Sequence, residues 1–303
     1  MLLVILTILH FIYIVNVTRQ KHMATITTLG PRIGRIETAN TYTAFSEMFE
    51  CRRYPAGESH IELMLPTQQV EHLTIEAAIV DFDGLGNMLT ADRILRRNGI
   101  RAQWFVPYFP FARHDRRNHI GDGFELGVAL DLVKDLDIVI ADPHSDVAGQ
   151  LPHIPQSASV ECFRDAGLLP DHAVIVIPDA GAIKKAHEWA TGPVVQALKH
   201  RDTATGRLSG FEVLADDLAG APCVIVDDIC DGGGTFLGLA VELANKNAGP
   251  LTLAVTHGLF TKGIDALSEA FDRIATFGFS GGPRVHGVDY FPFKNLYNKG
   301  ARR

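Results

Sequence analysis

The sequence predicts an α/β protein with mainly parallel sheets, and three observations support this fold class. Short apolar runs rich in Val and Ile recur along the chain, and helical stretches separate them. Such runs are typical of strands buried on both faces, as in parallel sheets covered by helices. Several of the runs also end in charged or polar residues, and ligands of such sheets bind beyond the carboxyl ends of the strands. The pattern therefore predicts both the fold and the edge where a site would lie.

We expect six strands with helices between them. The strands are predicted at 75–82, 102–108, 137–143, 172–179, 222–228 and 251–257. Helices are predicted at 88–99, 124–136, 182–190 and 236–246. With 303 residues and 47% hydrophobic content, the chain can bury a large core in one or two domains. Two successive α/β units fit this number of elements.

Composition excludes some classes of function. The net charge of −7 argues against a nucleic-acid-binding surface, and the chain has no long basic run. The four cysteines show neither CxxC nor metal-finger spacing: Cys51, Cys162, Cys223 and Cys230. We therefore expect reduced thiols in a cytoplasmic protein.

Residues 1–22 differ from the rest, because they open with the continuous apolar run MLLVILTILHFIYIVNV. The run is short for a transmembrane helix and lacks a basic start and a small-residue cleavage site. Three interpretations remain open: an upstream in-frame extension, an N-terminal anchor and a secretion signal. We favour the first and expect no membrane contact unless the run is a real anchor.

The segment CVIVDDICDGGGT at 223–235 predicts a ligand site. A buried strand ends in two carboxylates, and a glycine-rich turn then leads into a helix. Glycines allow backbone N–H groups to approach a phosphate, and a helix N-terminus adds positive potential. The carboxylates of Asp227, Asp228 and Asp231 would repel a bare phosphate. The ligand must therefore offer both a phosphate and groups that suit carboxylates.

With these residues, the chain from about Thr41 to Thr261 resembles the ribose-phosphate pyrophosphokinase family. VDDICDGGGT is similar to that family's signature for ribose 5-phosphate. The resemblance implies that Asp227 and Asp228 hold the ribose hydroxyls, which suit carboxylates. It further implies that the turn of Asp231, Gly232, Gly233, Gly234 and Thr235 cradles the 5-phosphate.

The segment VPYFPFARHDRR at 106–117 is similar to the family segment that grips ATP. The resemblance implies ATP-binding roles for Arg113, His114 and Asp115, although a solvated loop is the alternative. The family's adenine-contacting loop corresponds to YPAGE, which keeps Gly57 and Glu58 but loses an acidic residue.

Two further segments imply a Mg²⁺ site. DPHSD at 142–146 stands where the family has a metal-reaching histidine, and VIVIPDAGAIKKA resembles a family segment with a metal-linked aspartate. The implied ligands are Asp142, His144 and Asp179. A structural histidine and a helix N-cap are the alternatives for His144 and Asp179.

ALKHRD at 197–202 falls where the family carries K-x-R on a mobile loop. The resemblance implies that Lys199 and Arg201 are catalytic and that Arg201 also contacts the sugar phosphate. A charged strand edge would give the same alternating pattern.

The resemblance implies two phosphoribosyltransferase-like α/β domains at 23–165 and 166–303, the second carrying the sugar-phosphate loop, after the extension at 1–22. It implies Mg-dependent transfer of the β,γ-diphosphate of ATP to ribose 5-phosphate, giving phosphoribosyl pyrophosphate and AMP. A homo-oligomer is expected.

ADP-ribose is an alternative acceptor, since Gly232 and Gly233 leave the cradle less crowded. Two further functions stay open, namely a phosphoribosyltransferase and a non-catalytic synthetase-associated protein.

Overall fold

The structure is a computed structural model that describes residues 41–64, 72–117, 119–201, 208–279, 282 and 284–300. For residues 41, 72, 180, 199–201, 208 and 209 we describe the backbone alone. The predictions made for residues 1–22 lie outside these ranges. Within them, no helix is both long enough and apolar enough to span a membrane.

The first half of the described chain forms a five-stranded sheet in which every neighbouring pair is parallel. Its strands, in spatial order, are β1 (Thr41–Ala44), β4 (His72–Glu76), β5 (Arg101–Val106), β6 (Asp137–Ala141) and β7 (His153–Ile154). A separate antiparallel hairpin consists of β2 (Phe49–Arg53) and β3 (Ser59–Leu63). We call the five-stranded sheet the first sheet.

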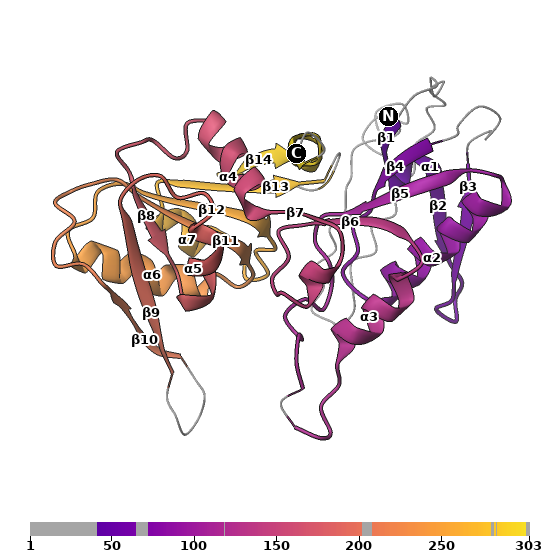
Figure 1. Ribbon diagram of the computed structural model, residues 1–303, viewed down its shortest axis with the longest axis horizontal. Coiled ribbons are helices and arrows are strands. Elements are labelled where there is room, and N and C mark those ends of the chain that lie inside the picture. Colours follow the sequence, from indigo (N-terminus) through magenta and orange to yellow (C-terminus); the bar gives the residue numbers. More distant parts are fainter. Residues whose placement is uncertain are drawn as a thin grey trace, which may run out of the picture.

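The second half forms a seven-stranded sheet, which we call the second sheet. Its spatial order is β10 (Leu208–Val213), β9 (Val194–Arg201), β8 (Val174–Ile177), β11 (Cys223–Cys230), β12 (Leu251–Gly258), β13 (Arg273–Gly278) and β14 (Asp289–Pro292). The pair β9–β10 is antiparallel and the other pairs are parallel. Figure 1 shows the two sheets as two lobes, with the β9–β10 hairpin extending away from the second.

Helices connect the strands. They are α1 (Phe45–Met48), α2 (Phe82–Arg97), α3 (Glu125–Val133), α4 (Gln156–Asp165), α5 (Ala180–Ala186), α6 (Gly234–Asn245), α7 (Asp265–Ala270) and α8 (Phe293–Gly300), with a 3₁₀ turn at Ala148–Gln150. Parallel strands with helical crossovers confirm the predicted α/β class with mainly parallel sheets.

The strand predicted at 75–82 is wrong beyond its first residues. Strand β4 ends at Glu76, and helix α2 begins at Phe82. Asp81 starts this helix, because its side chain accepts a hydrogen bond from the Gly84 N–H at 2.7 Å and so satisfies a free helix donor. The predicted helix at 88–99 is the C-terminal part of α2.

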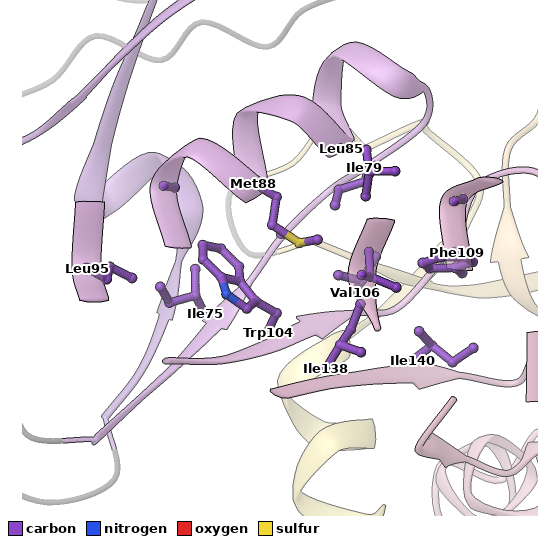
Figure 2. Packing of buried hydrophobic residues seen from close by; sticks show 14 of the residues in the cluster. Ile75, Ile79, Leu85, Met88, Leu95, Trp104, Val106, Phe109, Ile138 and Ile140 are labelled. Atoms are coloured by element: carbon purple, nitrogen blue, oxygen red, sulfur yellow. The ribbon is translucent and has the colours of Figure 1, made fainter. Parts of the chain in front are cut away.

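The core of the first sheet packs under α2 (Figure 2). Leu85, Met88 and Leu95 lie on one helix face and are buried. Trp104 is fully buried between this helix and the sheet, and its indole N–H donates to Asp92 at 3.0 Å. Burial of an indole without such a partner would be costly. Apolar packing and this hydrogen bond therefore hold α2 against the first sheet.

A second core joins the two sheets. It contains Phe105 and Ile154 from the first half together with Val226 and Phe277 from the second. Helix α4, just before the predicted domain boundary after residue 165, packs into the same core. That boundary stays a prediction.

Helix α8 adds a second connection between the halves. Tyr297 on this helix lies 5.1 Å from the Phe105 ring and 5.3 Å from the Tyr42 ring, measured between centroids. Its hydroxyl donates to Gln103 at 2.5 Å. On the other side, Phe293 stacks on Phe277 of the second sheet at 5.7 Å. Helix α8 therefore packs against both sheets.

Candidate functional site

A cleft of about 1240 Å³ lies where the carboxyl ends of strands from both sheets meet. This is the edge at which parallel α/β sheets bind ligands. The predicted site residues that line it are Arg113, His114, Asp115, Asp142, His144, Asp179, Asp227, Asp228, Asp231, Gly232, Gly233, Gly234 and Thr235. The cleft therefore gathers most of the residues predicted from the sequence.

The glycine-rich turn joins β11 to α6. Gly233 has φ +77°, a conformation that glycine adopts without strain, and its missing Cβ would lie 3.1 Å from Leu267. A Cβ on Gly232 would meet Lys262 at 3.2 Å, whereas one on Gly234 would meet nothing within 4 Å. Turn shape and packing therefore explain Gly233. The contact at Gly232 is with a flexible lysine side chain that can move aside, and Gly234 faces open space.

Asp228 is a tightly held carboxylate in the cleft. Its side chain is 8% exposed and accepts from Lys185 Nζ at 2.9 Å. It also pairs with His144 Nδ1 at 3.1 Å. Burial alone would raise the pKa of Asp228, but the His144 hydrogen bond and the Lys185 charge outweigh it and lower that pKa. Asp228 is therefore an anion in a fixed orientation.

Asp227, the neighbouring carboxylate, has the opposite surroundings. Its Oδ1 accepts the backbone N–H of Asp228 at 2.8 Å. Burial and the adjacent Asp228 charge raise the pKa of Asp227. The two carboxylates therefore have different electrostatic character, although they are adjacent in sequence.

Asp142 is buried and bound by protein donors. It accepts from Lys185 Nζ at 2.8 Å, from Thr256 Oγ1 at 2.6 Å and from Gln156 Nε2 at 3.2 Å. Its backbone has φ +41°, which is unusual for a residue other than glycine. These contacts give Asp142 a structural role at the end of β6, and its metal-ligand role stays a prediction.

The other two predicted metal ligands lie in the cleft. Asp179 caps α5, accepting from the N–H groups of Gly181 at 3.0 Å and Ala182 at 3.1 Å, so the N-cap alternative describes its geometry. His144 pairs with Asp228, and that hydrogen bond raises the pKa of His144. No cluster of three or more metal-ligating side chains occurs among the described residues. The metal-ligand roles of His144 and Asp179 therefore stay predictions.

Arg113 and Asp231 form an ion pair across the cleft. Arg113 Nη1 lies 2.7 Å from Asp231 Oδ2, and Thr261 Oγ1 donates to the other carboxylate oxygen at 2.6 Å. The Thr261 hydrogen bond and Arg113 lower the pKa of Asp231. The pair joins the segment predicted to bind ATP to the turn predicted to bind the sugar phosphate.

His114 and Asp115 lie beside Arg113 and are less constrained. His114 Nδ1 lies 3.2 Å from Glu125 Oε2, and its side chain is 63% exposed. Asp115 pairs with the exposed Arg116 at 3.0 Å. This side of the cleft therefore offers charged groups that can turn toward a ligand.

Two predicted residues, Gly57 and Glu58, are not brought into the cleft. Gly57 and Glu58 form the tip of the β2–β3 hairpin, where Tyr54 N–H donates to Glu58 O at 2.8 Å, and neither is among the lining residues. The backbone of Lys199 and Arg201 lies in strand β9, paired with Phe211 and Leu208 of β10. Both thus stand on a strand rather than on the predicted loop, because the antiparallel pairing continues through them. Their side chains lie outside the described residues, as do 202–207, and their catalytic role stays a prediction.

The sequence gives little sign of four residues that contact the cleft carboxylates: Lys185, Gln156, Thr256 and Thr261. Each contributes a hydrogen bond to one of them. Lys185 is part of the quoted segment VIVIPDAGAIKKA, but a lysine in a short helix usually indicates a solvated face. Only its place in the short helix that follows β8 and begins with Asp179 could have suggested a buried partner.

Several relatives found by sequence comparison carry the same name, ribose-phosphate pyrophosphokinase. The chain is 29% identical over 188 residues to ribose-phosphate pyrophosphokinase from Mycobacterium bovis, covering 57% of this chain and 57% of that protein. The Corynebacterium efficiens protein of the same name gives the same values. That of Aquifex aeolicus is 25% identical over 184 residues, covering 57% and 59%. The matched region is thus a little over half the length of these relatives. No family model matches the chain.

A solved structure has the same architecture. Phosphoribosylpyrophosphate synthetase from Mycobacterium smegmatis superimposes with a TM-score of 0.69 at 20% identity, covering 87% of this chain and 98% of that one. This likeness confirms the predicted fold class, an α/β protein with mainly parallel sheets flanked by helices.

Proposed function

The chain is a divergent relative of the ribose-phosphate pyrophosphokinases, and we propose that it transfers the β,γ-diphosphate of ATP to the anomeric hydroxyl of ribose 5-phosphate. The products would be phosphoribosyl pyrophosphate and AMP. The observation that carries this proposal is the cleft lined by the anchored carboxylate of Asp228 and its neighbour Asp227, by a glycine-rich helix start and by Arg113. The same cleft holds groups suited to a sugar, to its phosphate and to a polyphosphate.

The sugar would bind to the second sheet. Carboxylates of Asp227 and Asp228 accept hydrogen bonds from ribose hydroxyls, and the N–H groups of Gly232 to Thr235 receive the 5-phosphate at the start of α6. A helix N-terminus carries partial positive charge, which stabilises a phosphate there. In this arrangement the anomeric hydroxyl points into the cleft.

The nucleotide would bind on the side of the first sheet. Arg113 can leave Asp231 and meet the phosphates of ATP, because a guanidinium binds phosphate oxygens in a fork. His114 and Asp115 lie beside it. Magnesium, held by His144 and Asp179 together with phosphate oxygens, would supply charge neutralisation.

The transfer needs positioning and charge stabilisation more than covalent catalysis. The anomeric oxygen forms a bond to the β-phosphorus, the bond from that phosphorus to the α,β-bridging oxygen breaks, and AMP leaves. We propose that Lys199 and Arg201 meet the charge that develops on the leaving oxygens. Gly57 and Glu58 remain proposed adenine contacts, and the homo-oligomer is likewise a proposal.

The test is a product analysis. We expect Mg-ATP and ribose 5-phosphate to give AMP and no ADP, separated by ion-exchange chromatography. ADP as the main product would contradict a pyrophosphoryl transfer. Consumption of added phosphoribosyl pyrophosphate with a nucleobase, in the absence of ATP, would favour a phosphoribosyltransferase.

The acceptor is decided in the same assay. Gly232 and Gly233 suggest ADP-ribose as a second acceptor, but the positive φ of Gly233 and its packing against Leu267 explain that glycine without a wider cradle. We therefore favour ribose 5-phosphate. A kcat/KM for ADP-ribose above that for ribose 5-phosphate would reverse this choice.

A further inference from the structure

Lys185 lies at the point where the two sides of the cleft meet, and the proposed transfer gives it no role. Its ammonium group donates to Asp228 Oδ2 at 2.9 Å, to Asp142 Oδ1 at 2.8 Å and to the Pro143 carbonyl at 2.9 Å. A lysine ammonium has three N–H donors, so all of them are used by the protein. Lys185 is therefore held in one orientation and offers no donor to a ligand in this arrangement.

The three acceptors come from both sheets. Asp228 belongs to β11 of the second sheet, whereas Asp142 and Pro143 directly follow β6 of the first. Lys185 itself is on α5, which begins at the cleft with Asp179. One ammonium group thus fixes the distance between the strand end that carries His144 and the carboxylate that faces the sugar.

Without Lys185, Asp228 would keep His144 as its one side-chain partner among the residues that the structure describes. Asp142 and Asp228 would then be two buried carboxylates that both contact the space left by the ammonium group. Like charges in a poorly solvated site repel each other, and a hydrogen-bonded side chain that loses one of two partners can rotate. The carboxylate of Asp228 would lose its fixed direction.

We propose that Lys185 is a positioning residue for the acceptor sugar: it orients Asp228 to receive the sugar hydroxyls and ties this carboxylate to the end of β6. The inference rests on the proposed function, since it takes a phosphorylated ribose as the ligand of Asp228. It predicts that Lys185 affects sugar binding more strongly than nucleotide binding. A residue that only stabilises the fold would affect both alike.

The test compares Lys185→Met, Lys185→Arg and the matched control Lys299→Met. Lys299 is also a partly exposed, ion-paired lysine, 29% exposed against 28% for Lys185, but it pairs with Asp165 at 2.7 Å on the far helices α4 and α8. Calorimetry measures the Kd for ribose 5-phosphate and, separately, for a non-hydrolysable ATP analogue with Mg²⁺. Thermal unfolding is followed in parallel.

We expect Lys185→Met to weaken ribose 5-phosphate binding by roughly 10–100-fold, the usual effect of losing hydrogen bonds to a charged group. The Kd for the ATP analogue should change by less than about threefold. Lys185→Arg keeps the charge and should recover most of the sugar affinity, and Lys299→Met should leave both constants unchanged. If Lys185→Met does not fold, the double variant Asp142→Asn, Lys185→Met carries one buried charge fewer and is measured in its place.

Equal losses of sugar and nucleotide affinity in Lys185→Met would overturn the inference, as would unchanged sugar binding. The proposed function fails on a different observation, namely a wild-type protein that binds ribose 5-phosphate but forms no AMP. In that case the comparison of the two Kd values still decides the role of Lys185.

Discussion

The two sides of the cleft are built differently. On the second sheet, the side chain of Asp228 is 8% exposed and has two charged partners, and the glycine turn is fixed by packing. On the first sheet, the side chains of Arg113 and His114 are 45% and 63% exposed, and each contacts a carboxylate that is itself partly exposed. The proposed sugar side is thus preorganised, while the proposed nucleotide side is open to rearrangement.

In the proposed function, this difference matches what each ligand brings. At the carboxylates, a sugar phosphate offers neutral hydroxyls, whose hydrogen bonds are weak. These bonds contribute too little free energy to order flexible side chains, so the carboxylates must be ordered before the sugar binds. Mg-ATP brings several charges and a metal, which can pull flexible side chains into place. We therefore expect substitutions on the sugar side to be more damaging than those on the nucleotide side.

The largest effect is expected for Asp228→Asn. Removing one member of a buried, hydrogen-bonded charge cluster leaves Lys185 underpaired and takes away a sugar contact, so kcat/KM for ribose 5-phosphate should fall by roughly 10³-fold. AMP formation at varied sugar concentration measures it. The control is Asp289→Asn, which removes an exposed ion pair in the same sheet, where Arg273 Nη2 lies 2.8 Å from Asp289 Oδ2. This variant should change kcat/KM very little. Equal effects of both variants would contradict the proposed sugar site.

Lys199→Ala is expected to lower kcat by roughly 10²–10³-fold with little change in Tm. The physical reason is that a cation acting only on the transition state contributes nothing to the folded ground state. Steady-state kinetics and thermal unfolding measure the two quantities. Parallel losses of kcat and Tm would instead assign Lys199 to the stability of the β9–β10 hairpin.

Arg113→Ala should act mainly on the nucleotide. We expect kcat/KM for ATP to fall by roughly 10–100-fold, the range for a lost hydrogen bond to a charged group, with sugar affinity changed by less than about threefold. Arg53→Ala, which breaks an exposed pair with Asp83 of 2.5 Å, is the control and should have wild-type kinetics. A loss confined to sugar binding would place Arg113 on the other side of the cleft.

The Arg113–Asp231 pair should have the smallest effect, on stability. Because the folded state lowers the pKa of Asp231 from its ordinary value of 3.8, the stabilisation is present above that pH and is lost as the pH falls through the lower folded value. Both side chains are partly exposed to solvent, which screens the pair. The free energy of unfolding of the wild type should therefore exceed that of Asp231→Asn by only about 0.2–1 kcal/mol at pH 7. Urea unfolding at pH 7 and pH 3 measures this difference, which should shrink at the lower pH. A difference that grows toward pH 3 would have the wrong sign.

The sequence predicts the buried centre of each sheet well. β5, β6, β8, β11 and β12 coincide with the predicted apolar runs, because strands covered on both faces need continuous apolar residues. Elements that are not continuous apolar strands covered on both faces cannot be found from such runs. Helix α4 is one, because it buries polar residues such as Gln156 and Ser159, which pair with other buried groups. The β9–β10 hairpin is another, because it lies at the sheet edge and carries charges.

The same reasoning applies to the site. The carboxylates and glycines are predictable because the chain places them at or directly after the carboxyl ends of buried strands. Contacts between distant segments, such as Lys185 with Asp142 or Thr261 with Asp231, are not, because they depend on how the sheets and loops meet in space. Sequence spacing thus predicts which groups reach the edge of a sheet, but not which of them another side chain will bind.

Helix α8 has a consequence for the order of folding. The first sheet begins with β1 near residue 41, yet the helix carrying Tyr297, which covers Tyr42 and Phe105, is the last one described. Contacts so distant along the chain form late, because closing a long loop costs entropy before any contact is gained. During synthesis on the ribosome, the aromatic face of the first sheet would therefore stay uncovered until nearly all of the described chain has emerged. Until then, this exposed apolar surface would favour aggregation of the nascent chain.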